Sequence, residues 1–252
     1  MAIDDGPLGS SWDDEVFVEM NLLRSDIEQF QRIERKFNVD TATGDGVGGV
    51  LSGMSGWQPE HRHAWTLSLY LDTAQHLLLH NSIQGVEPVL HLRLRWYAPE
   101  DPPYVDHKER RGRKVDKWRV QLSQDLCFEL VRGTTDACLE LAEILQWKGA
   151  PLTPRFWVRY HRQAWNGPNR ARLTVDSSIV AQRWRPDVVD IQHLMNGDEH
   201  NWEPLVSGQV VEMKSSNEDN LELLDALGVG SLFSFSKFRA AGELLDLVGS
   251  SR

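Results

Sequence analysis

The chain has 252 residues, of which 40% are hydrophobic and 25% charged, so it is long enough to bury a sizeable core. Its 27 basic and 37 acidic side chains give a net charge of −10, which excludes a globally basic nucleic-acid-binding protein. No apolar run approaches the roughly 18 residues of a membrane span, no signal peptide opens the chain, and two cysteines are too few for a disulfide framework. These features favour a cytoplasmic protein without membrane insertion or nucleic-acid partners.

The first part of the chain is predicted to contain a leader, a helix and a strand. Residues 1–13 are typical of a disordered leader, followed by a single domain over residues 14–252. Apolar residues at helical spacing predict a short acidic helix from Asp13 to Glu28. The alternating stretch Gln31–Val39 predicts a strand with one charged face, and the glycine-rich residues 40–58 predict an irregular connector.

The rest of the chain alternates between predicted strands and helices. Strands are predicted over Trp65–Asp72, Val89–Tyr97, Tyr104–Lys108, Lys117–Leu122, Phe156–Gln163, Arg170–Asp176, Val180–Arg185 and Gln209–Lys214. Helices are predicted over residues 135–147, Leu221–Leu227 and Lys237–Val248. The predicted fold class is therefore mainly β with peripheral helices (α+β), and its strands are antiparallel.

Basic residues gather in two segments although the whole chain is acidic. Residues 91–119 hold nine basic and five acidic side chains, and residues 155–185 hold seven arginines and one aspartate. Such segments can be ordinary solvated strand faces. They can also build a local positive site that attracts a small polyanion while the exterior stays acidic.

Charged residues that are two positions apart on a strand share one face, about 7 Å apart. The pairs are Arg93 with Arg95, Lys117 with Arg119, Arg170 with Arg172, Glu34 with Lys36, and Glu212 with Lys214. Rows of cations suit a chain of phosphates, and a carboxylate among them suits Mg²⁺ or Mn²⁺ bridging phosphate oxygens. For any one pair, an ion pair on a solvated sheet is the simpler interpretation, but the whole set favours a phosphate site.

Other candidate motifs carry less information. Gly44–Gly49 looks like a phosphate loop, but no Lys-Ser/Thr follows, so we interpret it as part of a flexible connector. His61 and His63 have a spacing that can serve a metal, yet no third ligand accompanies them. The sequence has no G-x-S-x-G nucleophile motif, and neither Cys127 nor Cys138 lies in a catalytic motif.

Eight short motifs are each weak alone but specific in their order. They are Glu34–Phe37, Ser68–Thr73, Leu92–Tyr97, Val105–Lys108 with Val115–Arg119, Tyr160–Ala164, Arg172–Asp176, Val211–Lys214 and Phe235–Phe238. With these motifs, the chain from about residue 30 to 240 resembles the catalytic domain of the vacuolar transporter chaperone complex, the VTC domain. That family belongs to the triphosphate tunnel metalloenzymes and is related to the CYTH domains.

The resemblance implies an antiparallel β-barrel that forms a tunnel lined by Lys and Arg. It implies a polyphosphate polymerase, a phosphotransferase that moves the γ-phosphate of ATP onto a polyphosphate chain and releases ADP, with Mn²⁺ or Mg²⁺ as cofactor. By position, the catalytic cations are Lys36, Arg93, Arg95, Lys108, Lys117, Arg162, Arg172 and Lys237. The implied substrate-binding residues are Glu34, Arg119, Tyr160, Lys214 and Ser236, and the implied metal ligand is Glu212.

The sequence departs from the wider superfamily at two positions. Arg32 replaces the first Glu of its Glu-x-Glu-x-Lys motif, which fits the VTC branch better than the triphosphatases, and Asp106 stands where Glu is usual. A triphosphatase with the same tunnel and a non-catalytic polyphosphate-binding module stay open as alternatives. The SPX domain and membrane helices of eukaryotic members have no counterpart in this sequence, which therefore does not show what regulates the domain. An unidentified partner protein stays open.

Overall fold

The computed structural model describes most of the chain. The described residues are 33–60, 64–98, 103–112, 114–196, 201–215, 221–229 and 231–247. The expected leader, the expected helix from Asp13 to Glu28, and the histidines His61 and His63 lie outside these residues.

One antiparallel sheet forms the frame of the molecule. Its strands follow the order β1 (Ile33–Val39), β10 (Gln209–Ser215), β8 (Arg172–Arg183), β7 (Leu152–Asn166), β3 (Ala64–Thr73), β4 (Val89–Trp96), β5 (Tyr104–Arg111) and β6 (Lys114–Gln121). Two short strands extend it, because β2 (Gln58–Pro59) pairs with β7 and β9 (Glu203–Pro204) pairs with β8.

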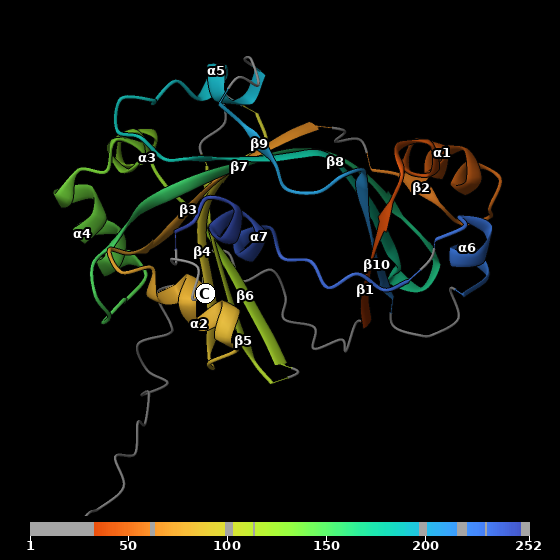
Figure 1. Cartoon of the computed structure of the whole chain (residues 1–252), viewed down its shortest axis with the longest axis horizontal. Coiled ribbons are helices and arrows are strands. Elements are labelled where there is room, and N and C mark those ends of the chain that lie inside the picture. The colour runs from red at the N-terminus through yellow and green to blue at the C-terminus, as the bar shows by residue number, and fades with distance from the viewer. Residues whose placement is uncertain are drawn as a thin grey trace, which may run out of the picture.

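The sheet is curled into a half-barrel. In Figure 1, β7 and β8 arch across the top, β4, β5 and β6 descend on one side, and β1 and β10 descend on the other. The strands at the two ends of the order, β1 and β6, therefore belong to opposite arms of the arch. The predicted fold class, mainly β with peripheral helices, is confirmed.

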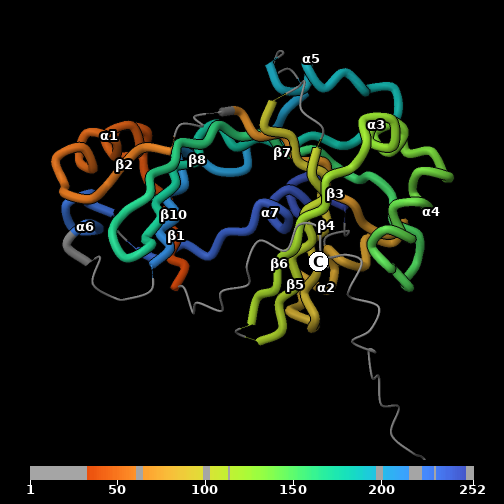
Figure 2. The backbone as a smooth tube through the Cα atoms, turned by 180° about the vertical axis from the view of Figure 1, so that it is seen from behind, coloured from red at the N-terminus to blue at the C-terminus, as the bar shows by residue number. Residues whose placement is uncertain are grey.

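Helices surround this frame and also lie beneath it. They are α1 (Thr41–Ser52), α2 (Leu77–Gln84), α3 (Gln124–Arg132), α4 (Thr135–Ile144), α5 (Ile191–Asn196), α6 (Leu221–Ala226) and α7 (Lys237–Leu244). Helices α1 and α6 flank the arm formed by β1 and β10, α3 and α4 lie at the opposite end, and α7 lies between the two arms (Figures 1 and 2). None of the described helices combines the length and the apolar character needed to cross a lipid bilayer.

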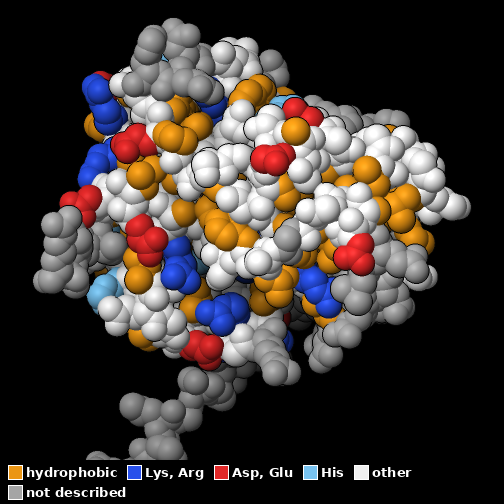
Figure 3. Space-filling view, turned by 45° about the vertical axis from the view of Figure 1, so that its right-hand side comes forward, with side chains coloured by type: hydrophobic (Ala, Val, Ile, Leu, Met, Phe, Trp, Pro, Cys, Tyr) orange, Lys and Arg blue, Asp and Glu red, His pale blue; other side chains and the backbone are white. Residues whose placement is uncertain are grey.

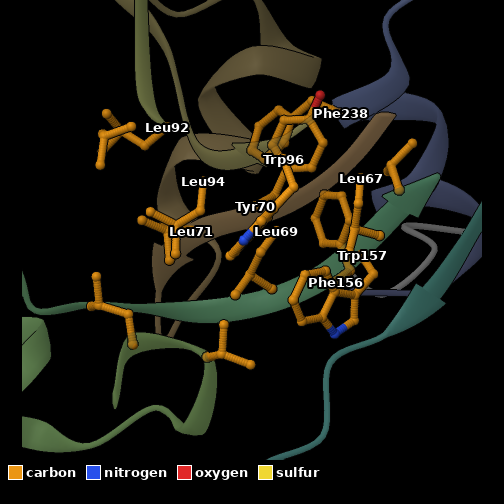
Figure 4. Close-up of a cluster of buried hydrophobic side chains, with 14 of the residues drawn as sticks. Leu67, Leu69, Tyr70, Leu71, Leu92, Leu94, Trp96, Phe156, Trp157 and Phe238 are labelled. Carbon is orange, nitrogen blue, oxygen red and sulfur yellow. The ribbon is translucent and has the colours of Figure 1, made fainter. Parts of the chain in front are cut away.

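The larger apolar core contains residues from both faces of β3 and its neighbours, and it reaches Phe238 of α7 (Figure 4). Leu67, Leu69 and Leu71 alternate along β3 and are completely buried on one face. Tyr70 points to the other face, where Phe238 of α7 packs against it with ring centroids 5.2 Å apart. This contact seats α7 on the concave side of the sheet.

A second apolar cluster covers the outer face of the other arm. Phe37 of β1, Val211 and Met213 of β10 pack there with Val47 and Leu51 of α1. Each such buried side chain contributes about 1.5–3 kcal/mol to stability. Because side chains alternate along a strand, the charged residues between these apolar ones must face the concave side.

Helix α1 replaces the connector that the glycine-rich sequence predicted. Asp40 caps it by accepting a hydrogen bond from the Thr43 backbone N–H at 2.7 Å, and its apolar residues join the second cluster. Gly44 lies so close to Gln209 that a Cβ atom would meet the Gln209 side chain at 2.1 Å. Tertiary packing thus outweighs the low helix propensity of glycine.

The strand prediction around residue 170 was also wrong in detail. Arg170 lies in a short 3₁₀ turn, Pro168–Arg170, with a left-handed φ of 59°, so it does not share a strand face with Arg172. The two strands predicted over Arg170–Asp176 and Val180–Arg185 form one continuous strand, β8, in which Ser178 has a φ of 49°. Helices α2, α3 and α5 were not predicted.

Candidate functional site

The charged residues of β1 and β10 face each other on the concave side of the sheet. Lys36 lies opposite Glu212, and Glu34 lies opposite Lys214. Lys36 Nζ is 2.9 Å from a carboxylate oxygen of Glu34 and 4.0 Å from one of Glu212. Lys214 makes a close ion pair with Glu212 and lies 3.9 Å from Glu34. The four side chains form a group of alternating charge, which we call the carboxylate–lysine quartet.

Both carboxylates of the quartet are ionised at neutral pH. Burial acts to raise the pKa of Glu212, but the cations Lys214 and Lys36 outweigh it and lower the pKa to about 2. Burial and the charge of Glu212 act to raise the pKa of Glu34, and here too Lys36 and Lys214 prevail, so the pKa is lowered. The quartet thus keeps two anionic oxygen ligands available.

Three arginines of β4 and β6 converge on one carboxylate of β5. Asp106 accepts hydrogen bonds from Arg93 at 3.1 Å and from Arg119 at 2.7 Å. It also forms an ion pair with Arg95 at 2.8 Å. Arg95 and Arg119 also donate to the hydroxyl oxygen of Tyr97, each at 2.9 Å. The arginines are therefore held in place before any ligand binds.

A second aspartate organises the cations beneath the arch. Arg162 binds both carboxylate oxygens of Asp176 at 2.6 and 2.7 Å, and Lys237 binds the same carboxylate at 2.6 Å. Both cations also lie over the ring of Tyr160, at 5.2 and 4.5 Å from its centroid. Burial acts to raise the pKa of Asp176, but Arg162 and Lys237 hold it well below its usual range.

Lys108 and Lys117 differ from the other cations of the concave side. They lie opposite each other on β5 and β6, and neither ammonium group makes an ion pair or hydrogen bond with a described residue. Burial, reinforced by the charge of Lys117, lowers the pKa of Lys108 to about 8. Burial and the charge of Lys214 lower the pKa of Lys117. Lys108 also responds to the charges of Glu34, Lys36 and Glu212, so the two arms face each other across the concave side.

Two predicted residues are engaged elsewhere. Arg172 is on the concave face opposite Lys214, but its guanidinium pairs with Glu60 at 2.6 Å. The hydroxyl of Ser236 accepts a hydrogen bond from the Arg239 backbone N–H at 3.5 Å and so caps α7. The segment before it, residues 231–235, runs along β1, and Lys36 Nζ donates to the Phe235 carbonyl at 3.0 Å.

The donor set fits a hard divalent cation with few protein ligands. No group of three His, Cys, Asp or Glu side chains that could hold a metal occurs within the described part of the chain. Glu34 and Glu212 offer ionised carboxylates on adjacent strands. Mg²⁺ in particular uses one or two carboxylates together with waters and substrate phosphates. These two residues are therefore the ones that would hold such an ion.

The sequence assigned no role to several residues of the concave face, including Asp106, which it noted only as a departure from the superfamily. Asp106 and Asp176 each organise several cations, Glu60 pairs with Arg172, and the hydroxyls of Tyr70 and Tyr97 accept hydrogen bonds from arginines. Asp106 and Asp176 sit within basic strands, which is a usable signal, whereas Glu60 is remote in sequence and depends on tertiary structure. In contrast to the grouped charges of the concave side, acidic and basic side chains are interspersed on the face shown in Figure 3.

Comparison with known proteins identifies the family. A sequence model of the VTC domain matches residues 22–245. The chain belongs to the VTC domain family. The comparison with curated proteins found no match to the chain. Family membership and the half-barrel fold support a domain that binds and processes triphosphates, of phosphotransferase or triphosphatase type.

The fold is shared with a solved bacterial structure. A putative adenylate cyclase from Bacillus halodurans superposes with a TM-score of 0.52 at 14% identity, covering 82% of this chain and 95% of that chain. A putative adenylate cyclase from Vibrio parahaemolyticus gives 0.49 at 12% identity, with coverages of 82% and 95%. A protein from Pyrococcus horikoshii gives 0.47 at 12% identity, with 84% and 99%. At such identities the Bacillus likeness shows the fold alone.

Proposed function

We propose that this VTC domain is a metal-dependent polyphosphate polymerase. It transfers the γ-phosphate of ATP to the end of a polyphosphate chain and releases ADP. The site residues carried over from the family are part of this proposal, as are Mn²⁺ or Mg²⁺ as cofactor and a single domain over residues 14–252. Family membership supports the substrate class, and the geometry of the concave side supports the chemistry.

One observation carries the proposal. Lys108 and Lys117 present two ammonium groups without a described counter-ion, and the carboxylate–lysine quartet faces them from the other arm. Two adjacent ammonium groups repel each other unless an anion lies between or beside them. A phosphate chain is such an anion, because each phosphate along it can contact a cation from either arm.

The side chains supply positioning and charge neutralisation, which are the main requirements of phosphoryl transfer. Asp106 fixes its three arginines, and Asp176 fixes Arg162 and Lys237. Groups that are already oriented need little reorganisation as charge moves in the transition state. Glu34 and Glu212 would hold the divalent ion, which supplies additional neutralisation of phosphate oxygens when bound.

The test is to incubate the purified protein with ATP and Mn²⁺, quench with a chelator, and record ³¹P spectra. Internal phosphoanhydride signals that grow together with ADP would support the polymerase. Orthophosphate without chain growth would contradict it and indicate a triphosphatase, and an unchanged ATP spectrum would indicate a binding module. The Glu212→Gln variant serves as the matched negative control.

A further inference from the structure

The carboxylate of Asp106 lies among cations, where an anion works against the binding of another anion. Its Oδ2 is 3.1 Å from Arg93 Nε and 2.8 Å from Arg95 Nη2, and its Oδ1 is 2.7 Å from Arg119 Nε. Its strand, β5, lies between the strands that carry these arginines. Only 14% of the side chain is exposed. One carboxylate therefore serves three guanidinium groups.

The three arginines retain donors after these contacts. Each guanidinium has five N–H donors. Arg93 uses one on Asp106 and one on the Tyr70 hydroxyl, at 3.1 Å. Arg119 uses one on Asp106 and one on Tyr97. The remaining donors are held in fixed directions, so the group is an oriented binding surface with an excess of positive charge.

We propose that Asp106 is a positioning residue that holds these arginines in place and at the same time weakens the binding of a polyanion to them. The inference rests on the proposed phosphate-binding function. An anion a few ångströms from a bound phosphate repels it, so the carboxylate opposes tight binding of both substrate and product. A charged chain that moves through a site must be bound weakly enough to dissociate from each position.

A merely structural ion pair predicts the opposite effect of substitution. If Asp106 only maintained the fold, Asp106→Asn would loosen the arginines and weaken anion binding. If it also offsets their charge, the same variant binds a polyanion more tightly. One unit charge at roughly 6 Å and an intermediate dielectric corresponds to about a tenfold change in the dissociation constant. The sign of the change therefore separates the two roles.

The experiment is a calorimetric titration of the metal-free protein with tripolyphosphate. We expect Asp106→Asn to bind it about tenfold more tightly than the wild type. Asp106→Glu keeps the charge and should bind within about twofold of the wild type. Asp187→Asn removes an exposed aspartate that pairs with Arg185 in the segment after β8, and should leave binding unchanged. ATP turnover by Asp106→Asn should fall, because the arginines lose their anchor and the product is retained.

Equal or weaker binding by a folded Asp106→Asn protein overturns the inference. If this variant does not fold, Arg119→Gln and the double variant Asp106→Asn with Arg119→Gln provide the same comparison, because removing both partners of a pair leaves no isolated charge. The double variant should bind more tightly than Arg119→Gln alone, and failure to do so also overturns it. A wild-type protein that does not bind tripolyphosphate would instead contradict the proposed function.

Discussion

The two arms of the half-barrel present cations in different ways. On β1 and β10, each lysine has a carboxylate partner, so the quartet is internally neutral. On β5 and β6, Lys108 and Lys117 face each other without a described counter-ion. The first arm is thus stable without a ligand and can exchange its lysine contacts for a metal. The two lysines of the second arm gain a contacting counter-ion only when an anion arrives. A phosphate chain with a metal ion bound beside it would contact both arms, with the metal at the first arm and the phosphates at the lysines of the second.

The strongest test of this contrast removes a carboxylate from the first arm. Glu212→Gln should lower ATP turnover about 100-fold or more and should weaken Mn²⁺ binding, because an amide is a poor substitute for an ionised metal ligand. Turnover follows from ³¹P spectra, and Mn²⁺ binding from electron paramagnetic resonance. Glu203→Gln on the exposed strand β9 is the control and should change neither. Unaltered Mn²⁺ binding in Glu212→Gln would remove Glu212 from the metal site.

The contrast also predicts competition between a lysine and the metal. Lys214 contacts both carboxylates of the quartet, so an incoming ion must displace its ammonium group. Lys214→Gln should therefore bind Mn²⁺ about fivefold more tightly in the same spectroscopic titration, since a pair of this kind contributes about 1 kcal/mol. Lys114→Gln removes an exposed lysine that pairs with Asp116, and should have no effect. Weaker Mn²⁺ binding by Lys214→Gln would refute the competition.

The second arm should make anion binding dependent on pH. With a pKa of about 8, Lys108 is cationic at pH 7 and mostly neutral at pH 9. The affinity for tripolyphosphate should fall severalfold between these values, and binding should take up protons near pH 8 because a bound anion favours the charged form. Calorimetry in buffers of different ionisation enthalpy measures this uptake. It should be smaller in Lys108→Gln, and an equal uptake in both proteins would contradict the assignment to Lys108.

Folding stability should respond to the same group in the opposite direction. The pKa of Lys108 lies at about 8 in the folded protein, below the ordinary value of 10.5. Between these two values the unfolded chain binds the proton and the folded chain does not. The contribution of Lys108 to stability therefore increases as the pH rises through this range.

The smallest expected effect concerns the helix that supports the first arm. A Cβ atom at Gly46 of α1 would have no neighbour within 4 Å, so Gly46→Ala should stabilise the protein by about 0.5–1 kcal/mol. Gly44→Ala should destabilise it, because the added methyl group meets Gln209. Chemical denaturation measures both. Two equal effects would show that α1 does not pack against β10 as described.

These elements also show what the sequence could and could not predict. Alternating strands such as β4 were predicted well, because one face is apolar and the other charged. The helix α1 was missed because its glycines have low propensity and its stability comes from contacts with distant strands. The cation rows were predicted, but the pairing of three arginines with Asp106 depends on strand register, which one sequence does not reveal.

The central claim is that Lys108 and Lys117, which have no counter-ion among the described residues, hold a phosphate chain. The direct test is calorimetric titration of tripolyphosphate into the wild type and into Lys108→Gln with Lys117→Gln, at two salt concentrations. We predict one ligand per chain, about 100-fold weaker binding in the double variant, and a smaller salt dependence, because two charge-assisted contacts are lost. Equal affinity and equal salt dependence in the two proteins would contradict the account.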